Sequence, residues 1–262
     1  MAYVDPAAEV GPDCRIGPFC YVGPGVKLGA GNELINNVTL TGAADIGEGN
    51  VFHPQCVIGG PPQDVGYKGE STRLVVGDRN CFRECSTVNR GTLKQDGVTL
   101  VGSDNLLMAC SHVGHDAIVE DDCILVNNAL LAGHVKIESH AIIGGASAMH
   151  HYTRVGQYAY IGGMTRIVHD VPPFMKYEGH PARVRGVNEV GLRRHGFDPE
   201  IIEQLNEAYK KLFRHCRTFT EALNEMEANT NGMCDQVHYL LAFLRAASGG
   251  KHGRAREALR KH

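Results

Sequence analysis

Residues 101–167 read VGSDNLLMACSHVGHDAIVEDDCILVNNALLAGHVKIESHAIIGGASAMHHYTRVGQYAYIGGMTRI, and every sixth residue of this stretch is large and apolar. The series begins at Val101, ends at Ile167 and contains twelve residues without a gap. A period of six fits neither the period of about 3.6 residues of an amphipathic helix nor the simple alternation of a β-strand. It indicates short strands that are separated by turns and that each send one large side chain inward.

The same period extends toward the amino terminus in a register shifted by one residue, with ten members from Val4 to Ile58 and three from Val76 to Val88. The residue after each of these ladder positions is often glycine, and the fifth residue of each hexad is usually small. Four of the nine cysteines occupy that small position, which indicates that they are packing residues. Three strands would close a triangular coil of eighteen residues, and stacked coils would lie at the parallel-strand spacing of about 4.8 Å.

This pattern resembles the hexapeptide-repeat, left-handed parallel β-helix of bacterial acyl- and acetyltransferases, and it covers residues 1–170. The resemblance supplies the left-handed sense, because connections between parallel strands are usually right-handed. Two polar segments with proline or glycine, residues 60–73 and 90–98, interrupt the period. We expect both to be loops ejected from the solenoid, where functional residues often gather.

The period ends near Asp170, and we expect residues 171–262 to form a connector and a small α-helical domain. An N-cap followed by proline opens a predicted helix over residues 198–213. A capping-box pattern opens a second helix over residues 218–227. A third helix is expected over residues 233–247, followed by a frayed tail.

The composition excludes several classes of protein. The 262-residue chain has a formal charge of −3, which argues against a dedicated nucleic-acid binder. No apolar run approaches the ~18 residues that cross a bilayer, and the amino terminus MAYVDPAAEV lacks the pattern of a signal peptide. The nine cysteines have neither the spacing of a zinc site nor that of a redox motif. We therefore expect a cytoplasmic protein with no membrane span.

The strongest functional signal comes from histidines in the later coils, namely His112, His115, His134, His150 and His151. Gly133 follows His115 by eighteen residues, or one coil, and His151 follows Gly133 by the same step. The same step leads from Asp116 to His134. The repeat therefore predicts a compact patch that combines several imidazoles, a carboxylate and a glycine amide.

Two chemistries could use this patch. A zinc enzyme of the gamma carbonic anhydrase class needs three neutral imidazoles around an open metal position. Such enzymes space their histidines by 36 and then 5 residues; here His115 and His151 are 36 apart, but Gly156 stands at the third position, so we expect no metal site. Acyl transfer needs a histidine base, a carboxylate that fixes its tautomer and a backbone N–H for the oxyanion. His115, Asp116 and Gly133 supply these three groups.

The resemblance becomes specific in four motifs: VGSDNLLMACSHVGHD (101–116), CILVNNALLAGHV (123–135), AIIGGASAMHHY (141–152) and DVPPF (170–174). They resemble the UDP-N-acetylglucosamine O-acyltransferase family, which acts first in lipid A biosynthesis. The resemblance implies transfer of an (R)-3-hydroxyacyl chain from acyl carrier protein to the 3-position of UDP-N-acetylglucosamine. It implies no bound cofactor, because the phosphopantetheine thioester arrives with its carrier, and a homotrimer with active sites between subunits.

The resemblance also assigns roles to individual residues. His115 matches the general base, Asp116 the carboxylate that orients it, and Gly133 the oxyanion amide. Gly163 matches the residue that closes the acyl groove, where glycine implies a long chain of the hydroxymyristoyl kind. The residues that match substrate contacts are Gln63, Asp64, His112, His134, His150, His151, Asn188 and Arg194.

Two positions depart from the family pattern. Gly66 stands where the family usually has lysine, and Lys68 is a candidate to replace that lysine. His151 stands where glutamine is more usual. The sequence leaves open whether the acceptor atom is a hydroxyl or the amine of a 3-amino sugar analogue.

The repeat pattern is also compatible with two other functions. The related N-acyltransferase of the same pathway normally carries an extra domain before the repeats, whereas the hexads here begin at Val4. A purely structural solenoid predicts no turnover. Seven Lys or Arg against three Asp or Glu between Arg154 and Arg194 indicate a docking surface for an acidic carrier protein, with Arg154, Arg166 and Arg183 as candidate contacts.

Overall fold

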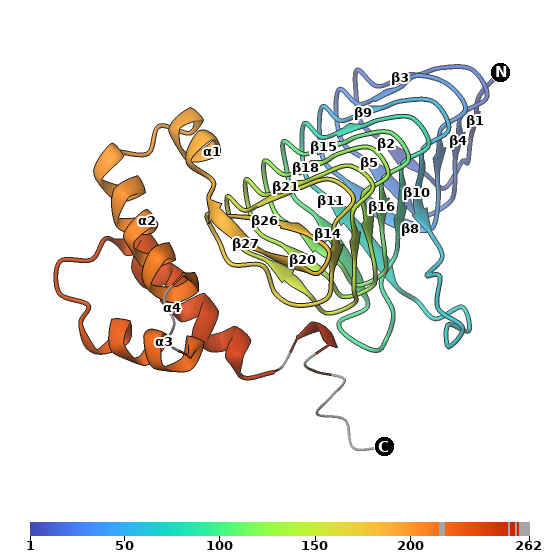
Figure 1. Cartoon of the computed structure of the whole chain (residues 1–262). Coiled ribbons are helices and arrows are strands. Elements are labelled where there is room, and N and C mark those ends of the chain that lie inside the picture. The colour runs from blue at the N-terminus through green and yellow to red at the C-terminus, as the bar shows by residue number, and fades with distance from the viewer. Residues whose placement is uncertain (215–217, 251, 255, 257–262) are drawn as a thin grey trace.

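The computed structural model describes residues 1–214, 218–250, 252–254 and 256. Residues 1–167 form a parallel β-helix in which short strands build three sheets along a triangular prism (Figure 1). Sheet 1 consists of β1 (Tyr3–Val4), β4 (Tyr21–Val22), β7 (Thr39–Leu40), β10 (Val57–Gly60), β13 (Thr87–Asn89), β16 (His112–Val113), β19 (Leu130–Leu131), β22 (Ala148–Met149) and β25 (Arg166–Ile167).

The other two sheets also take one strand from each successive coil along the prism. Sheet 2 consists of β2 (Glu9–Val10), β5 (Val26–Leu28), β8 (Ala43–Ile46), β11 (Arg73–Val76), β14 (Val98–Val101), β17 (Ile118–Val119), β20 (Lys136–Ile137) and β23 (Arg154–Val155). Sheet 3 consists of β3 (Arg15–Ile16), β6 (Glu33–Leu34), β9 (Val51–Phe52), β12 (Cys81–Phe82), β15 (Leu106–Leu107), β18 (Ile124–Leu125), β21 (Ile142–Ile143), β24 (Tyr160–Ile161), β26 (Met175–Gly179) and β27 (Ala182–Val187).

The ladder residues form the core of the prism, as the period of six predicts. His112 pairs with Leu130 and Leu130 with Ala148, so one coil contains eighteen residues wherever no loop intervenes. From Val22 to Ile167 the ladder is buried, and each fully buried aliphatic side chain stabilises the fold by about 1.5–3 kcal/mol. Val4 and Val10, in the first coil of the prism, remain 39% and 38% exposed.

Backbone geometry explains why glycine often follows a ladder position. A Cβ at Gly17 would lie 1.7 Å from the carbonyl oxygen of Ile35 on the next coil, so close stacking excludes a side chain there. The left-handed backbone conformation falls two residues later, and it is usually adopted by residues other than glycine, for example Asp116 with φ 59° and His134 with φ 63°. Asp, Asn and His tolerate this conformation better than most residues.

A column of buried asparagines, which the sequence analysis did not anticipate, ties the amino-terminal coils together. The side-chain oxygen of Asn32 accepts a hydrogen bond from the Asn50 N–H at 2.9 Å, and Asn50 and Asn80 repeat this contact with the next coil. The small cysteines behave as packing residues, and burial raises the pKa of the Cys56 thiol to about 11 and that of Cys123 to about 12.

The carboxyl-terminal part closes one end of the prism. Strand β26 extends sheet 3 beside β24 and pairs with β27 as an antiparallel hairpin, which the sequence did not predict. In the described chain four helices gather at this end (Figure 1). They are α1 (Glu189–Arg194), α2 (Pro199–Phe213), α3 (Phe219–Ala228) and α4 (Asp235–Ser248). A second hydrophobic cluster joins them to the last coil through Phe174 and Met175.

Helices α2, α3 and α4 confirm the three predicted helices, and Thr218 forms the expected capping box with Glu221. The short helix α1 was not predicted. The expected fraying of the tail is wrong for its described residues, because the Gly253 N–H donates to Tyr152 O and the Arg254 N–H to Val168 O, both at 3.0 Å. The rest of that expectation, residues 251, 255 and 257–262, lies outside the described residues. Among described residues no helix is both long and apolar enough to span a bilayer.

Candidate active site

The predicted patch lies at the corner of the prism that follows strands β16, β19 and β22, which we call the histidine corner. His115, Gly133 and His151 are the third residues of their hexads and stack one above another, as the eighteen-residue step requires. Asp116 and His134 are the next residues in the chain. The two ejected loops, residues 60–73 and 90–98, both reach this corner through contacts with these side chains.

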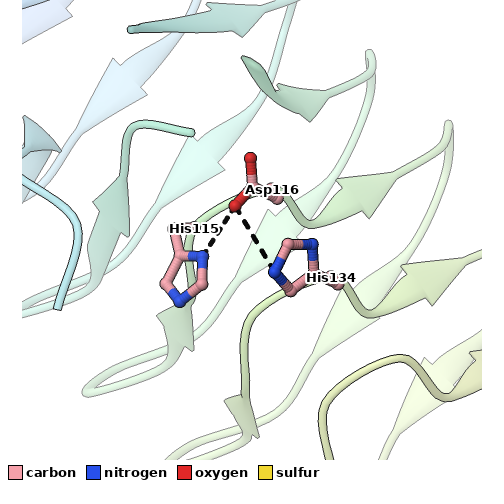
Figure 2. A group of neighbouring side chains, drawn as sticks. All are labelled: His115, Asp116 and His134. Atoms are coloured by element: carbon pink, nitrogen blue, oxygen red, sulfur yellow. Dashed lines mark hydrogen bonds and ion pairs between the residues drawn. The ribbon is translucent and has the colours of Figure 1, made fainter. Parts of the chain in front are cut away.

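His115 and Asp116 form a hydrogen-bonded pair (Figure 2). His115 Nδ1 lies 2.7 Å from Asp116 Oδ2, and the carboxylate is fully buried, with a side-chain exposure of 0%. A carboxylate only accepts hydrogen bonds, so Nδ1 carries the proton and Nε2 of the neutral ring is left as an acceptor. The imidazole is 14% exposed, so an incoming substrate can reach that acceptor.

Two threonines hold Asp116 in place. The Thr92 N–H donates to Asp116 Oδ1 and the Thr92 hydroxyl to Oδ2, each at 2.7 Å, and the Asp116 N–H donates to Thr99 Oγ1 at 2.8 Å. Burial opposes ionisation of Asp116, but the hydrogen bonds from His115 and Thr92 outweigh it and hold the pKa of the carboxyl below its usual value. The second loop thus holds the ionised carboxylate of Asp116 against the ring of His115.

His134 lies on the other side of the same carboxylate (Figure 2). Its Nε2 is 3.6 Å from Asp116 Oδ2, which is too long for a hydrogen bond, and its Nδ1 is 2.9 Å from Gln95 Oε1. Burial lowers the pKa of His134 to about 4, although the charge of Asp116 acts in the opposite direction. His134 is therefore neutral near pH 7.

Gly133 lies directly against the imidazole of His115. A Cβ at Gly133 would lie 2.4 Å from His115 Cε1 and 2.6 Å from Nε2, so only glycine leaves room for the ring. Among the residues that the structure describes, no acceptor takes a hydrogen bond from the Gly133 N–H. A free backbone donor thus stands beside the nitrogen that can accept a proton.

The first loop brings Asp64 to the site, whereas Gln63 is exposed and makes no hydrogen bond with any described residue. Asp64 Oδ2 lies 3.9 Å from His115 Nε2 and is paired with the ammonium of Lys94, which comes from the second loop. The Lys94 and Gly66 hydrogen bonds lower the pKa of Asp64. The substrate-contact role of Asp64 stays a prediction, and its position beside the base is consistent with it.

The remaining histidines lie around the same corner. His112 Nδ1 is 2.8 Å from Thr87 Oγ1, and burial lowers the pKa of its ring. The rings of His150 and His151 lie 4.0 Å apart, and His151 is 5.8 Å from Tyr152. Tyr152 in turn stacks on His134 at 4.2 Å. Ring contacts therefore join four of the predicted imidazoles, His115, His134, His150 and His151, through Tyr152. His112 shares no ring contact with them among the described residues.

Asn188, Arg194 and Gly163 lie elsewhere in the single chain. Asn188 caps α1 by accepting from the Gly191 N–H at 3.3 Å, and its amide donates to Tyr158 O at 3.0 Å. Arg194 is exposed in the last turn of α1. Gly163 follows β24 at the corner after sheet 3, where its added Cβ would lie 3.2 Å from Gly145 O. None of the described contacts of these three residues is with His115, Asp116 or His134.

The metal hypothesis can be tested against the donor set. Donor atoms of His115, Asp116 and His134 lie within 4.8 Å of one another, and they are the one such group among the described residues. The set has two imidazoles where the zinc enzyme needs three, and Asp116 Oδ2 already accepts from His115 and Thr92. The geometry therefore fits a base with its orienting carboxylate better than a metal site.

Sequence reasoning missed several residues of this site, among them Thr92, Lys94, Gln95 and Thr99. The signal that could have found the first three is the second ejected loop, since loops on a regular solenoid carry function. The docking hypothesis needs one correction. Arg154 is only 20% exposed, pairs with Asp170 at 3.1 Å and stacks on Phe243, so it supports the fold. Arg166 and Arg183 are exposed and remain candidates.

The parallel β-helix and its histidine–carboxylate corner define a hexapeptide-repeat transferase. The family model described as bacterial transferase hexapeptide (six repeats) matches residues 7–42. The model described as UDP-N-acetylglucosamine O-acyltransferase, domain 2, matches residues 170–253.

Individual proteins are similar over most of the chain. An acyl-[acyl-carrier-protein]–UDP-N-acetylglucosamine O-acyltransferase of Anaeromyxobacter sp. (strain K) is 45% identical over 192 residues, which are 73% of this chain and 74% of that protein. The crystal structure of the UDP-N-acetylglucosamine acyltransferase from Bacteroides fragilis superposes with a TM-score of 0.91 at 38% identity, over 96% of this chain and 97% of that one. The enzyme from Francisella novicida gives 0.85 at 31% identity, over 100% and 98%.

The chain therefore belongs to the UDP-N-acetylglucosamine O-acyltransferase family. The match confirms the expected left-handed parallel β-helix followed by a small helical domain.

Proposed function

We propose that this chain transfers an (R)-3-hydroxyacyl group from acyl carrier protein to the 3-hydroxyl of UDP-N-acetylglucosamine, as the first step of lipid A biosynthesis in the cytoplasm. The names of its relatives support the donor and the acceptor. The observation that carries the mechanism is the His115–Asp116 pair, whose imidazole presents Nε2 beside the Gly133 N–H, for which the described residues offer no acceptor.

The reaction begins when His115 Nε2 accepts the proton of the acceptor hydroxyl as its oxygen attacks the thioester carbonyl. Asp116 keeps Nδ1 protonated and stabilises the imidazolium that forms, as the carboxylate does in other histidine-based acyl transfers. The Gly133 N–H donates to the oxyanion of the tetrahedral intermediate. The carbonyl re-forms, the carbon–sulfur bond breaks, and the imidazolium returns its proton to the leaving thiolate.

The surrounding residues set the charge of the site. Asp116 is the buried anion, and His134 beside it remains neutral because its pKa is lowered to about 4. Asp64 also lies near the base but is paired with Lys94, so Asp116 is the carboxylate whose charge favours formation of the His115 imidazolium. General bases of this kind contribute about 10²–10⁴-fold in rate.

We propose that the active enzyme is a homotrimer whose sites lie between subunits. Gly163, Asn188 and Arg194 belong to other parts of the prism than His115, so their predicted roles in binding the acyl chain and the sugar nucleotide require a neighbouring copy. The donor brings its own phosphopantetheine, so the proposal includes no resident cofactor and no metal.

Mass spectrometry of the products is the direct test. The protein is incubated with acyl carrier proteins that bear hydroxyacyl chains of different lengths, with UDP-N-acetylglucosamine and separately with its 3-amino analogue. An O-acylated UDP-N-acetylglucosamine supports the proposal, whereas product from the amine alone would assign a different acceptor. A chelator should leave the rate unchanged; loss of activity that zinc restores would favour the metal hypothesis.

A further inference from the structure

Lys94 is a charged residue that contacts Asp64 beside the base and that neither the sequence analysis nor the mechanism has used. It lies in the second loop, and its ammonium is paired with Asp64 Oδ2 of the first loop. The same oxygen lies 3.9 Å from His115 Nε2. The ammonium and the base therefore stand on either side of one carboxylate, at the place where the acceptor hydroxyl must arrive.

The position of Lys94 coincides with a gap in the first loop. A Cβ added to Gly66 would lie 3.5 Å from Lys94 Nζ and 3.6 Å from its Cε, which is ordinary van der Waals contact. The end of the Lys94 side chain thus occupies the space that a long side chain at residue 66 would enter. The two loops share one cationic position, and in this chain the second loop supplies the cation.

Lys68 was the other candidate for this cation, and the structure argues against it. Its backbone N–H donates to Glu70 Oε2 at 2.8 Å, and its side chain is exposed on the outer part of the first loop. Among the described residues of the site, the positive charge of Lys94 lowers the pKa of Asp64 and that of His134. The contacts select Lys94 and not Lys68.

The chemistry of an ammonium suits the proposed acceptor. Lysine carries three donors, and among the described residues the Lys94 ammonium pairs with Asp64 alone. The side chain of Lys94 is 56% exposed while that of Asp64 is 9% exposed, so the remaining donors face open solvent beside a fixed carboxylate. A sugar nucleotide offers hydroxyl oxygens and a diphosphate to such donors.

We propose that Lys94 is a substrate-positioning residue that holds Asp64 toward the sugar and donates to an oxygen of the bound sugar nucleotide. The inference rests on the proposed function, because that function names the acceptor. Lys94 acts on binding of the acceptor, whereas His115 acts on the chemical step.

The test measures UDP-N-acetylglucosamine binding by calorimetry, together with the KM for each substrate. Lys94→Gln should weaken acceptor binding by about tenfold or more, the factor that corresponds to ~1.4 kcal/mol, while the KM for the acyl carrier stays unchanged. Lys68→Gln, which removes an exposed lysine of the first loop, is the matched control and should bind within about twofold of wild type. Lys94→Arg should retain most of the affinity.

A relocation variant sharpens the test. In Gly66→Lys combined with Lys94→Gln, the ammonium returns to the first loop, and binding should recover toward wild type. The added Cβ would lie 3.0 Å from Asp64 Oδ1, so the carboxylate must shift slightly, and a thermal melt checks that the variant is folded. If the folded variant does not recover acceptor binding, the inference that the two loops share one cationic position is contradicted.

The outcomes separate the two proposals. If Lys94→Gln binds the acceptor as wild type does, or if Lys68→Gln causes the larger loss, the inference is overturned while the proposed function stands. If wild type binds the sugar nucleotide but forms no acylated product with any carrier, the proposed function fails, and the binding data still decide the role of Lys94.

Discussion

Replacing Gly133 with alanine tests whether the position of the His115 ring controls the chemical step. The new Cβ would lie 2.4 Å from His115 Cε1, 2.6 Å from Nε2 and 2.9 Å from Nδ1. Ordinary carbon contacts begin near 3.4 Å, so the ring must move by about 1 Å. That movement takes Nε2 away from the acceptor and lengthens the bond between Nδ1 and Asp116.

A misplacement of about 1 Å in an active site can cost about 10²-fold in rate. We therefore expect Gly133→Ala to lower kcat by about 10²-fold, while calorimetric binding of UDP-N-acetylglucosamine changes little. The assay is steady-state transfer from a single acyl carrier protein, with product detected by mass spectrometry.

Gly145→Ala is the matched control. Gly145 is also the third residue of its hexad, but its added Cβ would lie 3.3 Å from Asn127 O and 3.4 Å from Val126, which the coil accommodates with a small shift. This variant should keep a kcat close to wild type. A folded Gly133→Ala enzyme with wild-type kcat would refute the argument that Gly133 is required to make room for the base.

Three further predictions follow from other parts of the molecule. Gly163→Met should shift preference toward shorter donors, since each buried methylene contributes about 0.8 kcal/mol; an unchanged length profile would leave Gly163 as a turn residue only. Glu in place of exposed Arg166 and Arg183 should raise the KM for the carrier at low salt and less so at high salt; an unchanged KM would place docking elsewhere. His134 has a folded-state pKa lowered to about 4, so between that value and about 6.5 the unfolded chain binds more protons than the folded one and stability falls as pH falls. The Tm of wild type should therefore drop more between about pH 7 and pH 5 than that of His134→Gln, and equal drops would remove His134 as the cause.

The β-helix could be predicted from the sequence because a single six-residue period describes nearly all of its strands. Burial of the ladder from Val22 to Ile167 follows directly from the six-residue spacing, and the eighteen-residue step is enough to predict that His115, Gly133 and His151 lie in one column. The helices with strong caps were equally predictable, since Thr218 and Glu221 carry their own boundary signal.

Contacts that depend on irregular backbone could not be predicted in this way. Thr92 donates twice to Asp116 only because the second loop folds back over the histidine corner. The six-residue period does not predict the path of a loop that leaves the coil. Arg154 looked like a surface charge, but tertiary packing places Asp170 and Phe243 around it. The hairpin β26–β27 and helix α1 are short, and their sequences lack the repeated pattern that made the coils recognisable.

The positions of Asn188, Arg194 and Gly163 show a further limit. Their predicted roles came from resemblance, and a single chain places them away from the histidine corner. Sequence periodicity describes one chain and does not tell which surfaces of two copies meet. Light scattering should therefore show a trimer if these residues contribute to the same site.

The central claim is that His115 removes the proton of the acceptor hydroxyl, and the kcat of His115→Ala tests it most directly. The side chain is 14% exposed and makes its hydrogen bond to Asp116, so its removal should leave the ladder and the fold intact. We predict a loss of about 10²–10⁴-fold in kcat in an enzyme that remains folded and binds the acceptor nearly as well as wild type. A folded His115→Ala enzyme that turns over at close to the wild-type rate would contradict the mechanism.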